Sequence, residues 1–216
     1  GTTGESPTLS HDEHKKLVEV CVEQANGRVP VIAGAGSNST SEAVDFVKHA
    51  CAAGADGLLV VTPYYNKPTQ SGLLAHYNEL IKNSSKPIII YDIPGRSVIK
   101  MSDNTMAELA KNDLIVGVKD ATADLARPTR LQNLIGDDFI QLSGEDGTAL
   151  AYLAAGGHGC ISVTANIAPN LLSRMHNAWK QGDITNAQDI NKKLMPLHDS
   201  LFCETSPGPL KYAASL

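Results

Sequence analysis

Short apolar runs alternate with longer amphipathic stretches along most of the chain. The apolar runs predict strands over residues 30–34, 57–63, 87–91, 114–118, 139–143 and 160–164. Between them, apolar side chains recur at helical spacing, which predicts helices over residues 41–53, 70–82, 103–111, 127–135 and 147–155. A further helix begins after Ser10, which forms a capping box with Glu13.

The spacing of these strands predicts the fold class. Strand starts near residues 31, 58, 88, 115, 139 and 160 are separated by 27, 30, 27, 24 and 21 residues. This period is typical of strand–helix units with right-handed crossovers and parallel strands. We therefore predict an α/β fold, a (β/α)8 TIM barrel of which six strands are present, followed by a C-terminal helical region with no further strand.

Composition narrows the class of protein. The chain has 216 residues and a formal net charge of −5, with no run rich in Lys and Arg, so we expect no nucleic-acid binding. No apolar stretch approaches the roughly 18 residues of a membrane span, and residues 1–10 do not resemble a signal peptide. The four cysteines are scattered without a C-x-x-C pair, which favours reduced thiols in a cytoplasmic protein.

Lys119 directly follows the apolar strand over residues 114–118. Parallel α/β folds place their chemistry at the C-terminal ends of strands. An ammonium there is unfavourable unless it is paired or loses its proton to become a nucleophilic amine. On position alone, a lysine that reaches solvent as the strand ends is the simpler interpretation.

Polar residues after the other strands favour a catalytic lysine over a lysine that reaches solvent. Tyr64 and Tyr65 follow one strand, and Tyr91 and Arg96 end or follow the next. In a barrel these residues face the same opening as Lys119. A desolvated lysine can form an imine with a keto group, tyrosine hydroxyls can relay protons, and an arginine fork suits a carboxylate. We find no nucleotide loop, no Ser-His-Asp order and no metal cluster, so we predict neither a metal nor an external cofactor.

Several motifs together resemble the 4-hydroxy-tetrahydrodipicolinate synthase family, also called dihydrodipicolinate synthases, a group of pyruvate-dependent class I aldolases. The motifs are Gly1-Thr2-Thr3-Gly4-Glu5, Val61-Thr62-Pro63-Tyr64-Tyr65, Tyr91-Asp92-Ile93-Pro94-Gly95-Arg96, Gly117-Val118-Lys119-Asp120-Ala121-Thr122, Gly156-Gly157-His158-Gly159 and Ser162-Val163-Thr164-Ala165-Asn166. The resemblance implies a lyase that condenses pyruvate with L-aspartate-4-semialdehyde in lysine and diaminopimelate biosynthesis. It also implies a cytoplasmic dimer of dimers.

The resemblance assigns roles residue by residue. Lys119 would form the Schiff base with pyruvate, and Tyr91 would be the general acid/base. Thr2 and Tyr65 would complete a proton relay, with Tyr65 reaching into the neighbouring subunit. The substrate-binding groups would be Thr3 for the pyruvate carboxylate, Arg96 for the aspartate semialdehyde carboxylate, and the backbone of Gly144 and Ile161.

The resemblance also implies feedback inhibition by lysine. Family members inhibited by lysine bind it at the dimer interface, and the matching residues here are Ser6, His11, His14, Asn38, Glu42 and Tyr64. A second interpretation is that His11 and His14 only decorate an exposed helix start. We expect the inhibition.

Two other functions stay open. The related N-acetylneuraminate lyases share the tyrosine and lysine motifs but lack an arginine at the position of Arg96, so Arg96 favours the synthase. A catalytically inactive truncated form is the other alternative. By the resemblance the first two barrel strands are absent, residues 1–166 hold strands 3 to 8, and residues 167–216 form an incomplete helical region. The family commonly has asparagine where this chain has Asp92.

Overall fold

The structure is a computed structural model that describes residues 1–216, and its centre is one sheet of six parallel strands. Strand order follows chain order, and every neighbouring pair is parallel. The strands are β1 (Ile32–Gly34), β2 (Gly57–Val61), β3 (Ile88–Asp92), β4 (Ile115–Asp120), β5 (Ile140–Ser143) and β6 (Gly159–Cys160). All six predicted strands are therefore present, and the predicted α/β class is confirmed.

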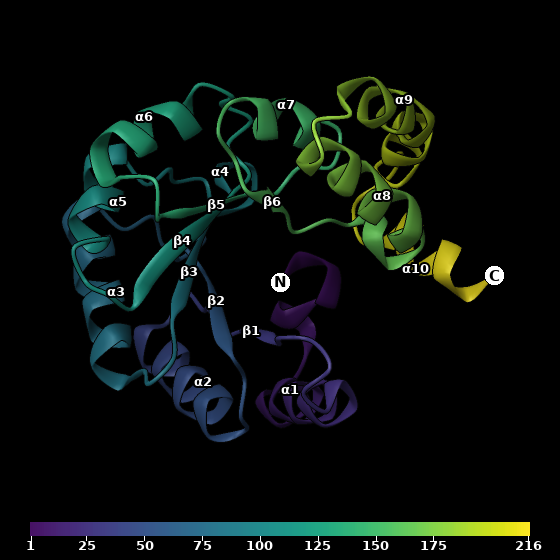
Figure 1. Ribbon diagram of the computed structural model, residues 1–216. Coiled ribbons are helices and arrows are strands. Elements are labelled where there is room, and N and C mark those ends of the chain that lie inside the picture. Colours follow the sequence, from purple (N-terminus) through teal and green to yellow (C-terminus); the bar gives the residue numbers. More distant parts are fainter.

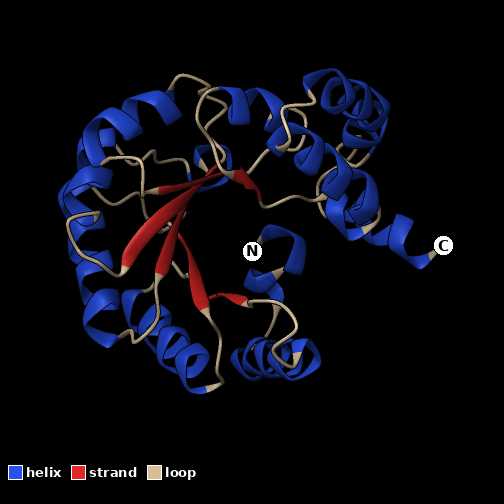
Figure 2. Cartoon of the chain, in the orientation of Figure 1, coloured by secondary structure: helices blue, strands red, loops and turns tan.

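Helices cover the outer side of the curled sheet (Figure 1). They are α1 (His11–Ala25), α2 (Thr40–Ala52), α3 (Gln70–Asn83), α5 (Asp103–Leu109), α6 (Arg127–Ile135) and α7 (Ala149–Ala154). The short helix α4 (Pro94–Ser97) instead follows the C-terminal end of β3, inside the ring of helices (Figure 1). The sheet forms an arc rather than a closed ring, and two short 3-10 turns, η1 (Thr2–Gly4) and η2 (Ser6–Thr8), lie at its open side (Figure 2). The capping box predicted at Ser10 and Glu13 is formed.

The last predicted strand is shorter than the sequence pattern indicated. It was expected over residues 160–164, but β6 ends at Cys160 and the chain turns into η3 (Thr164–Asn166). The backbone N–H groups of Val163 and Thr164 donate to the buried carboxylate of Asp146 at 2.8 and 3.1 Å. Because these donors bond a side chain, they do not extend the strand ladder.

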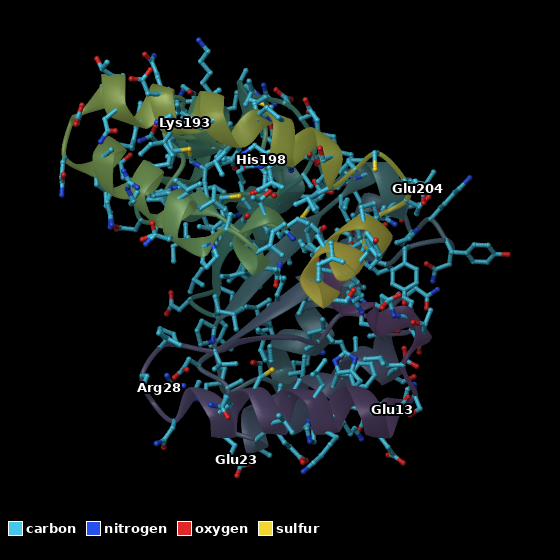
Figure 3. All side chains as sticks on the ribbon, turned by 90° about the vertical axis from the view of Figure 1, so that its right-hand side faces the viewer. Glu13, Glu23, Arg28, Lys193, His198 and Glu204 are labelled. Atoms are coloured by element: carbon cyan, nitrogen blue, oxygen red, sulfur yellow. The ribbon has the colours of Figure 1, made fainter.

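The chain after residue 166 is helical. It forms α8 (Pro169–Lys180), α9 (Ile184–Ser200) and α10 (Gly208–Ser215), and α8 and α9 share a small apolar cluster separate from the main core. A polar contact connects α9 to the barrel. His198 Nδ1, on α9 (Figure 3), lies 2.8 Å from Thr164 Oγ1. The boundary between residues 166 and 167 stays a prediction.

None of the helices combines the length and the apolar composition that a membrane span needs. The four cysteines are unpaired, and Cys21 and Cys203 are exposed.

Gly117 allows β4 and β5 to approach closely, and replacing it should weaken the sheet. A β-carbon there would overlap the carbonyl oxygen of Ile140 and lie 2.8 Å from its Cβ, so backbone would have to move. We expect Gly117→Ala to lower the free energy of unfolding by about 1–3 kcal/mol, measured by urea denaturation. Gly208→Ala is the control, because nothing lies within 4 Å of that position. Equal stabilities of the two variants would contradict this account.

Candidate active site

Lys119 and Tyr91 lie side by side near the C-terminal ends of β4 and β3. The two residues are register partners in the parallel ladder. Lys119 Nζ lies 4.1 Å from the centroid of the Tyr91 ring, and the residues are only 9% and 4% exposed. Neighbouring register positions of a parallel sheet point to the same face, so strand pairing itself brings the amine to the phenol.

Burial controls the protonation of the amine. It lowers the pKa of Lys119 below its ordinary value, and the nearby Cys160, Asp146 and Glu145 oppose the shift without reversing it. The neutral, nucleophilic amine is therefore more accessible at Lys119 than at an exposed lysine.

The pKa of the Tyr91 phenol shifts in the opposite direction. Burial raises the pKa of Tyr91, although a hydrogen bond with the Thr2 side chain and the charge of Arg96 oppose the rise. The hydroxyl of Tyr91 therefore keeps its proton at neutral pH and can donate it. A neutral amine beside a protonated phenol is the arrangement that imine formation requires.

A pocket of about 330 Å3 lies beside Tyr91, at the C-terminal ends of β2 and β3, and Lys119 is not among its lining residues. It brings together three predicted site residues, Thr2, Tyr91 and Arg96. Ser6 and Tyr64, both predicted for the lysine site, also line it. Ser206 and Pro207, from the segment between α9 and α10, complete this side of the pocket.

Sequence reasoning missed Ser206 and its contact with Arg96. The guanidinium of Arg96 donates from Nη2 to the carbonyl oxygen of Ser206 at 3.1 Å, across 110 positions of the chain. The prolines at 207 and 209 indicate that the chain turns after α9, but they do not indicate which part of the barrel this turn contacts.

The remaining predicted residues are less central to this pocket. Gly144 N–H donates to the Asp120 carbonyl at 2.6 Å and Ile161 N–H donates to the Ser143 carbonyl at 2.9 Å, so both amides already have partners. Thr3 is half-buried but does not line the pocket. Tyr65 is 85% exposed with a positive φ of 73°, and its side chain is not in the pocket.

The comparisons with known proteins agree with one another. The sequence profile of the Dihydrodipicolinate synthetase family matches residues 1–216. The 4-hydroxy-tetrahydrodipicolinate synthase of Acidiphilium cryptum is 63% identical over 216 residues, which are 100% of this chain and 74% of the relative. The chain belongs to the dihydrodipicolinate synthetase family.

Solved structures show the same relationship. The crystal structure of the chloride-inhibited dihydrodipicolinate synthase from Acinetobacter baumannii, complexed with pyruvate, is 44% identical, with a TM-score of 0.96. That of the enzyme from Cyanidioschyzon merolae with lysine bound is 37% identical, also with a TM-score of 0.96. In both, the match covers 100% of this chain and 74% of the solved one. The TIM-barrel prediction and the prediction of an enzyme of this type are thereby confirmed.

A second, smaller pocket of about 80 Å3 lies between the N-terminal turns, α1 and α2. Five of the six residues that the family resemblance assigns to lysine binding line it: Ser6, His11, His14, Glu42 and Tyr64. The sixth, Asn38, does not, and its carbonyl accepts from Asn66 Nδ2 at 2.9 Å.

The groups of this second pocket are already engaged with one another and with the barrel. His11 Nε2 lies 2.5 Å from Glu42 Oε1, and His14 Nε2 lies 2.7 Å from the Gly34 carbonyl oxygen. Gly34 ends β1, so His14 connects this pocket directly to the first strand of the sheet.

Proposed function

We propose that this protein condenses pyruvate with L-aspartate-4-semialdehyde through a Schiff base on Lys119. The observation that carries the proposal is the buried amine of Lys119 placed over the ring of Tyr91. Membership of the family and the pyruvate complex of the Acinetobacter enzyme support the same chemistry.

The two pKa shifts favour the first step of this chemistry. The neutral amine of Lys119 attacks the keto carbon of pyruvate, a C–N bond forms, and the keto oxygen leaves as water after accepting protons through Tyr91. The protonated imine then withdraws electrons, so that the methyl group loses a proton and becomes a nucleophilic enamine. This enamine attacks the aldehyde carbon of the second substrate. The amino group of the condensed product can then displace Lys119 and close a ring.

Charge recognition would come from the pocket rim. Each substrate carries a carboxylate, and the fork of Arg96 can bind one in a bidentate manner. The carbonyl of Ser206 holds that guanidinium at the pocket. We assign Arg96 to the aspartate semialdehyde carboxylate and Thr3 to that of pyruvate. Gly144 and Ile161 would contribute carbonyl oxygens, since their N–H groups are occupied.

Borohydride trapping tests the proposal directly. Wild-type protein incubated with pyruvate and borohydride should gain one reduced adduct, which intact mass would detect and peptide mapping would place on Lys119. Turnover assays should then show condensation with aspartate semialdehyde and none with N-acetylmannosamine, the aldehyde partner expected of the lyase alternative. Folded protein that forms no adduct would overturn the proposal and favour the inactive alternative.

The pH dependence of trapping gives a separate prediction. Because burial lowers the pKa of Lys119 below 10.5, its neutral fraction rises with pH through a lower range than that of an exposed lysine. The trapping rate with pyruvate should therefore rise with pH and level off below pH 10.5. A rate that still climbs at pH 10.5, as expected of a free amine, would contradict the desolvated site.

Feedback inhibition by lysine belongs to the same proposal. The five residues around the second pocket and the lysine-bound Cyanidioschyzon structure support it. Glu42 supplies the carboxylate that can pair with an amino group of lysine, and hydrogen bonds to charged groups contribute about 1.5–3 kcal/mol. We expect Glu42→Gln to raise the half-inhibitory lysine concentration at least about tenfold.

Glu23→Gln is the matched control for that substitution. Glu23 is exposed on α1 and projects into solvent (Figure 3), so its removal should leave inhibition unchanged. An uninhibited wild-type enzyme at saturating lysine would end this part of the proposal.

We also propose a cytoplasmic homo-oligomer, a dimer of dimers, that needs no cofactor beyond the imine itself. The exposed ring of Tyr65 supports the assembly, because a large aromatic with 85% exposure suits a partner's site better than solvent. Light scattering of Tyr65→Ala against wild type would test it.

A further inference from the structure

A cluster of charged side chains is buried on the outer side of the sheet, behind the Lys119–Tyr91 pair. Its centre is Arg127, the first residue of α6. Arg127 has no exposed surface. Its Nη1 donates to Asp92 Oδ2 at 2.7 Å and lies 3.6 Å from Asp120 Oδ2. Asp92 and Asp120 are 0% and 3% exposed. One guanidinium therefore hydrogen-bonds the Asp92 carboxylate of β3 and forms a longer ion pair with Asp120 of β4, whose Oδ2 has no hydrogen-bond partner.

The other donors of Arg127 bond groups that lie outside the two strands. Nε donates to Asp103 Oδ1 and Nη2 to the Met101 carbonyl, both at 2.9 Å. The second oxygen of Asp103 accepts from Arg130 Nε at 2.8 Å. The guanidinium is thus anchored to the start of α5 as well as to the strand ends, and its position is fully determined.

The cluster lies one residue beyond the reacting pair on both strands. Asp92 follows Tyr91, Asp120 follows Lys119, and both couples are register partners in the ladder. Successive side chains of a strand point to opposite faces. Tyr91 and Lys119 therefore share the inner face, while the two carboxylates share the outer one. Any separation or rotation of the strand ends at the carboxylates also moves the amine relative to the phenol.

We propose that Arg127, Asp92 and Asp120 form a positioning cluster that sets the spacing of Lys119 and Tyr91 for imine formation. This inference rests on the proposed function. Two buried carboxylates at adjacent register positions repel each other. The guanidinium between them offsets this repulsion by attracting both, and so holds the ends of β3 and β4 at a defined spacing, as a clamp. In agreement, the pKa of Arg127 is raised, because Asp120 and Asp92 outweigh the effect of its burial.

Arg127→Lys tests the clamp while retaining its charge. A single ammonium lacks the fork that reaches Asp92, Asp103 and the Met101 carbonyl together. We expect the borohydride-trapping rate and kcat to fall about 10- to 100-fold, while KM for pyruvate changes little, because misplacement by about 1 Å has effects of this size. The matched control is Arg174→Lys, the same substitution at an exposed arginine of α8 outside this cluster, which should trap at the wild-type rate.

A second readout separates positioning from loss of structure. If Lys119 moves off the Tyr91 ring, the pH of half-maximal trapping shifts, whereas partial unfolding lowers the amplitude and leaves that pH unchanged. Folded Arg127→Lys with the wild-type rate and pH midpoint would overturn the positioning role. If Arg127→Lys does not fold, Asp120→Asn is the deciding variant, since it keeps the shape of the side chain and removes one charge of the cluster. Slower trapping with a shifted midpoint supports the role, and wild-type behaviour overturns it. A wild type without any adduct would overturn the proposed function and this inference with it.

Discussion

Lys119→Met is expected to abolish the pyruvate adduct and to reduce turnover by at least about 10³-fold, the scale seen when a covalent nucleophile is removed. Methionine has a similar length and no amine, so it occupies the inner face of β4 without forming an imine. Burial lowers the pKa of Lys119, so the folded state disfavours the charged form of this amine. Its removal should therefore leave the folded state at least as stable as the wild type.

Intact mass after borohydride treatment and a turnover assay measure these effects, and thermal unfolding checks stability. Lys48→Met is the control, because Lys48 is exposed on α2. It should retain both adduct and activity. An adduct that persists in Lys119→Met would place the imine on another amine and refute the assignment.

Tyr91→Phe is expected to lower kcat by about 10²–10⁴-fold, the usual contribution of a positioned general acid or base. The ring that lies 4.1 Å from Lys119 Nζ is retained, so the amine keeps its neighbour and only the proton donor is lost. Trapping should become slow rather than absent, because water can deliver the proton with lower efficiency. The persistence of a slow adduct distinguishes Tyr91→Phe from Lys119→Met.

Stopped-flow or timed quenching with borohydride measures the rate of adduct formation. Tyr212→Phe is the control, since Tyr212 is 68% exposed on α10 and does not line the pocket. Wild-type rates in Tyr91→Phe would show that the buried phenol transfers no proton in the rate-limiting step.

The sequence by itself determined the order and type of the secondary elements. Short continuous apolar runs are typical of strands buried on both faces, and their regular spacing predicts a parallel sheet with helical crossovers. All six predicted strands are present, although β6 is shorter than predicted. The sequence also placed Lys119 at the end of β4, because burying an ammonium group in an apolar strand is unfavourable unless the group has a function or reaches solvent. The resemblance then supplied roles for the residues that follow the other strands.

Only the tertiary structure decided which distant residues complete the site. The contacts of Arg127 with Asp92 and of Arg96 with Ser206 join positions 35 and 110 residues apart, and no local period encodes them. The same reason explains the short β6, whose predicted continuation is bonded instead by Asp146. Periodicity records which face of an element is buried, whereas the partner of a buried charge depends on how the elements pack in three dimensions.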